Sequence, residues 1–337
     1  MKFLKMGDWH LGVKQDDPWI QGIQWDGIQQ AINYSLEHGI KRWLQAGDVF
    51  DVRKAITHKT MQFTRQIFNA IEDAGIKLDI VVGNHDMTFK EKIHPNACTE
   101  LLTQFKNVTI HDKFNTITID GIEIDMIPWI CSENAVDILA NIGKTKSKYC
   151  MGHFELNGFY FYKGLKSRGV EPDFLKGYKR VWSGHFHTIS ESNNVTYIGT
   201  PWTLTAGDEN DKRGFWVFDT ETEESEFIAN ETMWHRRIHY PSSINPEMYR
   251  NLSVRVVINS IDKDLVKFET ALENVVHELK MINKVDHLVE FNDVEDEIEI
   301  KTLNEMMDEY VDALDIKSED AESIKKMANE LYLEVSK

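Results

Sequence analysis

The chain has 337 residues, of which 42% are hydrophobic and 28% charged, and its formal net charge is −17. This is the composition of a globular protein with two domains, or with one large domain and an appendage. No run of about 18 apolar residues occurs, which excludes a transmembrane helix, and three unpatterned cysteines predict a reducing compartment, the cytoplasm.

Apolar strand candidates alternate with helical stretches through roughly the first 150 residues. Helices are expected over Trp25–His38 and Lys54–Ala74, each followed by a glycine. Residues 107–130 alternate with period two and turn at Asp120-Gly121, which predicts an antiparallel hairpin. The β-α-β-α-β order predicts an α/β layered domain. Its strands are expected at 3–6, 42–46, 78–82, 147–151, 179–183, 195–200 and 214–219.

A second region begins near Pro241. It contains a strand candidate over 253–261 and an amphipathic helix over Leu265–Ile282. Strand candidates follow at 287–292 and 297–300, and two apolar helical faces finish the chain, one over Leu303–Leu314 and one beginning at Ser318. We therefore expect three units, at 1–240, 241–301 and 302–337.

Five of the predicted strands end with a glycine followed by Asp, Asn or His. The pairs are Gly7-Asp8, Gly47-Asp48, Gly83-Asn84, Gly152-His153 and Gly184-His185, with His10 and His187 two residues beyond the first and the last pair. Ligands of α/β sheets bind beyond the carboxyl ends of strands, and glycine permits a sharp turn and a close approach there. The five loops are therefore expected to converge on one point.

The converging side chains offer carboxylate, amide and imidazole groups but no thiolate. They are Asp8, His10, Asp48, Asn84, His153, His185 and His187. Such a set suits Mn²⁺, Fe²⁺ or Zn²⁺ rather than a structural cysteine–zinc site. Seven side chains are too many for one four-coordinate ion, whereas two ions with a bridging carboxylate use them all. Each pair alone would be an ordinary turn, and only their repetition indicates a two-ion site of the kind that displaces oxygen at phosphorus.

Together these residues resemble the calcineurin-like metallophosphoesterases, whose motifs are D-x-H, G-D-x-x-D, G-N-H-[DE], G-H and G-H-x-H. The matching motifs cover residues 7–187. D-W-H-L-G near the start, Tyr197–Pro201 and Lys212–Phe215 resemble the SbcD-type nuclease branch. Asp51 is followed by Val52-Arg53 rather than Arg-Gly, which separates the chain from the protein phosphatases. The resemblance implies a two-sheet α/β/β/α sandwich with a small α+β capping domain and C-terminal helices.

The resemblance also implies roles for the site residues. Asp8, His10, Asp48 and His187 would hold one divalent ion, and Asp48, Asn84, His153 and His185 the other, with Asp48 bridging. The ions are expected to be Mn²⁺, with Mg²⁺ as the second choice, and would lower the pKa of a water molecule at the phosphorus. His85 would act on the phosphate as a catalytic residue, and Asp86 would orient its imidazole.

The function implied is that of a metal-dependent DNA nuclease, an exonuclease on duplex ends and an endonuclease on single strands, in DNA recombination, repair and replication. Its partner would be an SbcC-type ATPase, bound through the C-terminal helices, with a homodimer of this chain inside a heterotetramer. Two alternatives stay open: a non-catalytic scaffold that tethers DNA to the ATPase, and a phosphodiesterase for small substrates. The alternative for the C-terminal helices is a hairpin that folds onto this chain's own body.

The charge is uneven along the chain. Residues 250–337 hold 22 acidic and 11 basic residues and therefore carry most of the net charge of −17. An acidic tail does not grip a phosphate backbone, so weak DNA binding by the isolated chain and stronger binding with the ATPase are expected. Basic side chains that could contact DNA are Lys14, Arg53, Lys54, Lys59, Lys163, Lys166 and Arg168.

Overall fold

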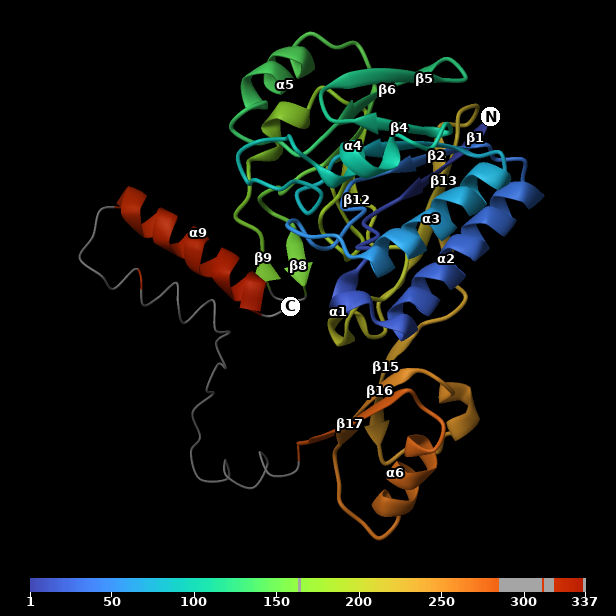
Figure 1. Cartoon of the computed structure of the whole chain (residues 1–337). Coiled ribbons are helices and arrows are strands. Elements are labelled where there is room, and N and C mark those ends of the chain that lie inside the picture. Colours follow the sequence, from blue (N-terminus) through green and yellow to red (C-terminus); the bar gives the residue numbers. More distant parts are fainter. Residues whose placement is uncertain (163–164, 285–310, 312–317, 336–337) are drawn as a thin grey trace.

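The computed structural model describes residues 1–162, 165–284, 311 and 318–335. Its main body contains two six-stranded sheets with helices on their outer faces (Figure 1). This is the α/β/β/α sandwich that the resemblance implied. The first sheet has the order β14-β13-β1-β2-β3-β4. Its strands are β1 (Lys2–Met6), β2 (Arg42–Gln45), β3 (Lys77–Val81), β4 (Val108–His111), β13 (Gly214–Asp219) and β14 (Glu224–Ala229).

Helices α2 (Pro18–Glu37) and α3 (His58–Asp73) cover the outer face of the first sheet, and the short α1 (Val13–Asp16) and α4 (Ala97–Leu102) flank them (Figure 1). Helix α2 begins earlier than predicted because the Asp17 side chain caps the amide of Trp19 and Pro18 fits the first helical position. Helix α3 begins later than predicted, where the Thr57 side chain accepts a hydrogen bond from the Thr60 amide.

The second sheet has the order β11-β12-β10-β7-β6-β5, and α5 (Ala135–Ile142) and the 3₁₀ helix η1 (Pro172–Leu175) pack on its outer face. Its strands are β5 (Asn115–Ile119), β6 (Ile122–Ile127), β7 (Tyr149–His153), β10 (Arg180–Gly184), β11 (Ser190–Ser192) and β12 (Val195–Tyr197). The hairpin that turns at Asp120-Gly121 is confirmed as β5–β6. Residues 108–111, which were predicted to belong to it, instead pair with β3 as β4, because a period of two shows a strand but not its sheet.

Side chains alternate between two apolar layers along the inner strands of the first sheet, β13, β1, β2 and β3. In β1, Phe3 enters the layer between the sheets, whereas Leu4 enters the layer beneath α2 and α3. Trp182 and Phe218 fill the inter-sheet layer in edge contact, with ring centroids 5.1 Å apart. This packing fixes the two sheets against each other, so that their strand ends share one edge of the sandwich.

A smaller three-stranded parallel sheet follows, made of β15 (His235–Tyr240), β16 (Ser253–Ile258) and β17 (Glu278–Asn283). Helix α6 (Leu265–Glu273) and the 3₁₀ helix η3 (Pro246–Tyr249) pack on one face of it. The helix predicted over Leu265–Ile282 is wrong in its second half, because β17 pairs with β16 along its whole length and this pairing overrides the local pattern. The boundary predicted at residue 240 coincides with the end of β15, and the division into units stays a prediction.

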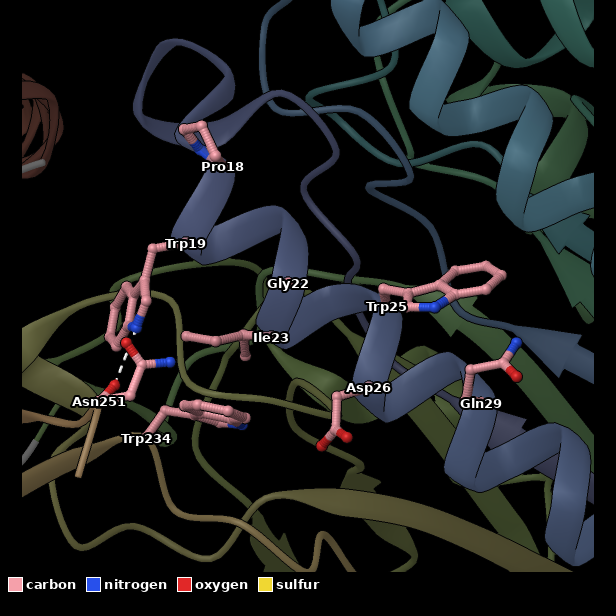
Figure 2. A pocket seen from close by; sticks show the side chains of 9 residues that line it. All are labelled: Pro18, Trp19, Gly22, Ile23, Trp25, Asp26, Gln29, Trp234 and Asn251. Carbon is pink, nitrogen blue, oxygen red and sulfur yellow. Dashed lines mark hydrogen bonds between the residues drawn. The ribbon is translucent and has the colours of Figure 1, made fainter. Parts of the chain in front are cut away.

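Helix α2 meets the smaller sheet at Trp19 (Figure 2). The Trp19 indole nitrogen donates to the Asn251 carbonyl at 2.9 Å, and its ring stacks on His277 with centroids 4.3 Å apart. Beside this contact is a cavity of about 400 Å³, to which Ile23 and Trp234 also contribute. The aromatic contact holds the smaller sheet at the N-terminal end of α2.

The remaining described elements are a two-stranded sheet of β8 (Tyr160–Tyr162) and β9 (Leu165–Lys166), the 3₁₀ helix η2 (Ala206–Asp208) and helix α9 (Ser318–Val335). Helix α9 confirms the helix expected from Ser318. The strands expected at 287–292 and 297–300, and all of the helix expected over 303–314 except Val311, lie outside the described residues. None of the helices in the described part of the chain combines the length and hydropathy that a membrane span needs.

Candidate metal centre

The predicted ligands meet at the shared edge of the two sheets. Strands β1, β2 and β3 of the first sheet and β7 and β10 of the second all end there. Five of the seven side chains are buried, and two from the loop after β10 are partly exposed. In chain order the seven are Asp8, His10, Asp48, Asn84, His153, His185 and His187. All seven are close neighbours, as the distances below show.

The glycines of the motifs are required by close packing between the loops. A Cβ atom on Gly83 would lie 2.2 Å from Oδ1 of Asp48, and one on Gly7 would lie 1.9 Å from the Gly199 carbonyl oxygen. Gly47 adds a φ of +95°, a conformation that side chains disfavour. The glycines therefore let the five loops approach closely enough for their side chains to share one site.

Several ligand residues themselves have strained backbones. His10, Asp48 and His185 have φ values of 49°, 54° and 90°. Non-glycine residues rarely adopt positive φ, and such strain of about 1–3 kcal/mol persists mainly where surrounding structure enforces it, often at functional sites. Here it turns the side chains of three loops toward a common centre.

The first group of ligands consists of Asp8, His10 and His187. Their ligand atoms lie within 4.8 Å of one another. The Nε2 atoms of the two histidines are 3.0 Å apart, and Nε2 of His187 is 3.9 Å from Oδ2 of Asp8. Two imidazole nitrogens and a carboxylate oxygen that converge in this way are donor types that suit a divalent cation.

The second group consists of Asp48, His153 and His185, whose ligand atoms also lie within 4.8 Å of one another. The Asn84 side-chain oxygen joins it, at 2.9 Å from Nε2 of His153 and 3.0 Å from Nδ1 of His185. Nδ1 of His153 lies 2.7 Å from the Ala46 carbonyl oxygen, which leaves Nε2 as the nitrogen that faces the group.

Asp48 belongs to the second group but also lies beside the first. Its Oδ2 atom is 3.3 Å from Nε2 of His153 in the second group and 4.0 Å from Nε2 of His10 in the first. Its Oδ1 atom accepts a hydrogen bond from the His85 amide at 2.7 Å. This position is suited to a carboxylate that is shared by two ions.

Burial and charge perturb the titration of the site. Burial raises the pKa of Asp8 to about 6. Burial also acts to raise the pKa of Asp48, but the nearby His153 and His85 imidazoles hold it well below its usual range. Burial opposes charge on His153, yet the Asp48 and Asp8 carboxylates raise its pKa to about 9. The proton on the His153 imidazole thus offsets the charge of the ionised Asp48 carboxylate, and a divalent ion would take the place of that proton and release it.

His85 and Asp86 occupy different environments from those predicted. Nδ1 of His85 lies 2.7 Å from the Asp51 carbonyl oxygen, so a backbone group, rather than Asp86, stands at that ring nitrogen. The Asp86 carboxylate accepts from the amides of Asp48, Phe50 and Gly83 at 2.9–3.0 Å. Asp86 therefore fastens the loop after β2 to the loop after β3, because a buried carboxylate needs such donors.

Sequence reasoning missed two further residues of the site. Asp51 places Oδ1 3.1 Å from Nδ1 of His10 and forms a third group with His10 and His85. The sequence did carry a signal for Asp51, because it is the second aspartate of the G-D-x-x-D motif. The Trp129 ring packs at a tilt against that of His185, with centroids 5.1 Å apart. It carried no sequence signal, because it follows β6, which bears none of the motifs.

The donor set fits divalent ions. It combines carboxylate and amide oxygens with imidazole nitrogens in two groups that share one aspartate, all at one sheet edge. Such ligands suit ions of intermediate hardness, and two neighbouring ions bound to them are a common device for phosphoester hydrolysis.

Residues 1–188 match the model of the calcineurin-like phosphoesterases, more than half of the chain. The chain belongs to this family. Membership implies divalent metal ions at the edge where the motifs converge, and a phosphoester as the bond that is cleaved. The expected fold and the expected family are thereby confirmed.

This phosphoesterase is also similar to exonuclease subunit 1 of Enterobacteria phage T4. The two are 59% identical over 339 residues, which cover 100% of each chain. Within the SbcD-type branch, the chain resembles the recombination nuclease subunit of a T-even phage, and this relative confirms that resemblance.

Two solved structures are also similar to the chain. A novel archaeal phosphodiesterase is 16% identical, with 68% of this chain and 99% of that chain covered and a TM-score of 0.37. An anchor protein of the inner membrane complex of Plasmodium is 13% identical, with 83% and 96% covered and a TM-score of 0.42. Both TM-scores are low, so the family assignment rests on the sequence matches.

Proposed function

We propose that this phosphoesterase is a two-metal DNA nuclease, an exonuclease on duplex ends and an endonuclease on single strands. The observation that supports this best is the position of Asp48 between two ligand groups, within 4.0 Å of a histidine in each. The phage relative named as an exonuclease subunit supports DNA as the substrate, because its match is full-length.

The proposed division of the ligands follows the two groups. Asp8, His10 and His187 would hold one ion, and Asn84, His153 and His185 the other, with Asp48 shared. Bound ions, with Mn²⁺ expected, supply Lewis acidity and a water of lowered pKa.

His85 is proposed as the proton donor to the leaving oxygen. Its Nδ1 lies 2.7 Å from the Asp51 carbonyl, a contact that keeps Nδ1 protonated and fixes the ring. In the imidazolium form the second nitrogen then carries the proton that can be transferred. Asp86 supports this step through the backbone, since its oxygens accept from the Asp48, Phe50 and Gly83 amides.

We further propose that the chain works with an SbcC-type ATPase in the host cytoplasm, in DNA recombination, repair and replication, as a homodimer within a heterotetramer. The support is the name of the relative, which makes that protein one subunit of an exonuclease. The C-terminal helices, of which α9 is described, are the proposed docking segment.

The test is release of nucleotides from end-labelled duplex DNA by the purified chain, first in EDTA and then in excess Mn²⁺. Release that depends on Mn²⁺ and is lost in Asp48→Asn supports the proposal. Absence of release, even with the ATPase added, would favour the tethering scaffold. Hydrolysis of a small phosphodiester in place of DNA would favour a small-substrate phosphodiesterase.

A further inference from the structure

A buried arginine lies behind the first ligand group. The side chain of Arg213, next to the first residue of β13, is 1% exposed. Its Nη2 donates to Asp208 at 2.8 Å and to Asp211 at 3.4 Å. Burying a guanidinium is costly unless it is paired and hydrogen-bonded, so its position and its partners are mutually fixed.

The other end of the guanidinium holds the backbone of an ion ligand. Nη1 of Arg213 donates to the carbonyl oxygen of His187, which also accepts from the Thr200 amide at 3.0 Å. The next residue is held as well, because the Thr188 hydroxyl donates to Asp211 at 3.0 Å. The His187 carbonyl and the Thr188 side chain are thus tied to one cluster, defined here as Asp208, Asp211 and Arg213.

The same segment is attached to the smaller sheet. The Asn210 side chain donates to the Arg237 carbonyl at 3.3 Å and accepts from the Arg237 amide at 3.4 Å. Glu209 pairs with Arg237 and lies 3.8 Å from Arg255 on the neighbouring strand. Residues 208–213 therefore contact β15 and β16 on one side and the His187 loop on the other.

We propose that Arg213 is a positioning residue for His187, and that residues 208–213 make ion binding by Asp8, His10 and His187 depend on the docking of the β15–β17 sheet. The inference rests on the two-ion site of the proposed function. It names groups behind the ligands that set their geometry, and loss of such groups typically weakens metal binding by about 10- to 100-fold.

The first test is a titration of the full chain with Mn²⁺, in which the EPR signal of the free ion measures binding. Arg213→Lys keeps the positive charge but loses the planar guanidinium, which donates to the Asp208 and Asp211 carboxylates and to the His187 carbonyl at the same time. It should weaken one of two binding steps by about tenfold or more and leave the other unchanged. Arg250→Lys is the matched control, since Arg250 also pairs with a carboxylate, Glu247, but on the surface.

A double-mutant cycle separates positioning from general loss of stability. In His187→Gln, which lacks the ligand that Arg213 holds, Arg213→Lys should change Mn²⁺ binding little. Equal weakening in both backgrounds would overturn the positioning role. If Arg213→Lys does not fold, Thr188→Val takes its place in the same cycle. This variant removes the hydroxyl that donates to Asp211.

The link to the smaller sheet is tested by Glu209→Gln, with Glu247→Gln as its control. Glu209→Gln should weaken the same binding step by about fivefold, a typical coupling between sites. An unchanged isotherm would overturn the dependence on the β15–β17 sheet. Wild-type protein that binds no Mn²⁺ would instead refute the proposed two-ion function itself, so the two failures are distinguishable.

Discussion

At the scale of single residues, the proposed function assigns ion binding and proton transfer to different side chains. Asp48 contacts both ligand groups, whereas His85 is held by the Asp51 carbonyl beside them. Removing a shared ligand should affect ion binding, and removing a proton donor should affect turnover alone.

His85→Gln should therefore keep both ions and lose turnover by about 100- to 10,000-fold. Asp48→Asn should lose ions together with activity, because it weakens both groups. Metal content of the purified variants, measured beside DNA hydrolysis, checks the division. Loss of metal from His85→Gln would contradict it.

Gly83 is required because the loop after β2 leaves no room for a side chain at this position. Gly83→Ala would place a methyl group 2.2 Å from Oδ1 of Asp48, so we expect a loss of about 1–3 kcal/mol in the free energy of unfolding and weaker metal binding.

Gly22→Ala in α2 is the matched control, because no atom lies within 4 Å of the added carbon. It should stabilise the protein by about 0.5–1 kcal/mol. Denaturant unfolding of both variants measures the contrast, and a tolerated Gly83→Ala would show that the loops are not tightly packed.

At the scale of elements, the strand ends were predictable and the strand partners were not. Glycine followed by a ligand residue marks the end of β1, β2, β3, β7 and β10 from local chemistry alone. The sheet to which β4 belongs, and the change from α6 to β17, depend on pairing with distant segments. The seven predicted site residues were foreseeable because local sequence motifs mark them. The contacts of Asp86 and the position of Trp129 were not foreseeable, because they depend on segments that are distant in the sequence.

The junction of β15 with the main body should respond to pH. His235 lies 2.8 Å from the Thr203 hydroxyl, and burial lowers its pKa to about 4. The unfolded chain binds this proton near pH 6.5, whereas the folded chain resists it, so stability is lost as pH falls below that value.

Between neutral pH and about pH 5, wild-type protein should lose about 2 kcal/mol more in the free energy of unfolding than His235→Asn, which keeps a hydrogen-bonding group without this titration. Denaturant unfolding at both pH values measures the difference. An equal loss in the two proteins would show that His235 does not resist protonation.

At the scale of the whole molecule, the net charge of −17 opposes a DNA substrate. Local cations must supply the attraction, and metal ions at the proposed site would be the strongest. The isolated chain should bind duplex DNA with a Kd on the order of 10 µM or weaker near physiological salt, and more weakly still in EDTA. A salt titration by fluorescence anisotropy measures this, and tight binding at high salt would show a basic surface of its own.

The central claim is that one sheet edge holds two ions that share Asp48. Anomalous diffraction from crystals grown with Mn²⁺ tests it most directly. We predict two peaks, one beside Asp8, His10 and His187 and one beside Asn84, His153 and His185, both in contact with Asp48. A single peak, or two peaks that do not share Asp48, would contradict the claim.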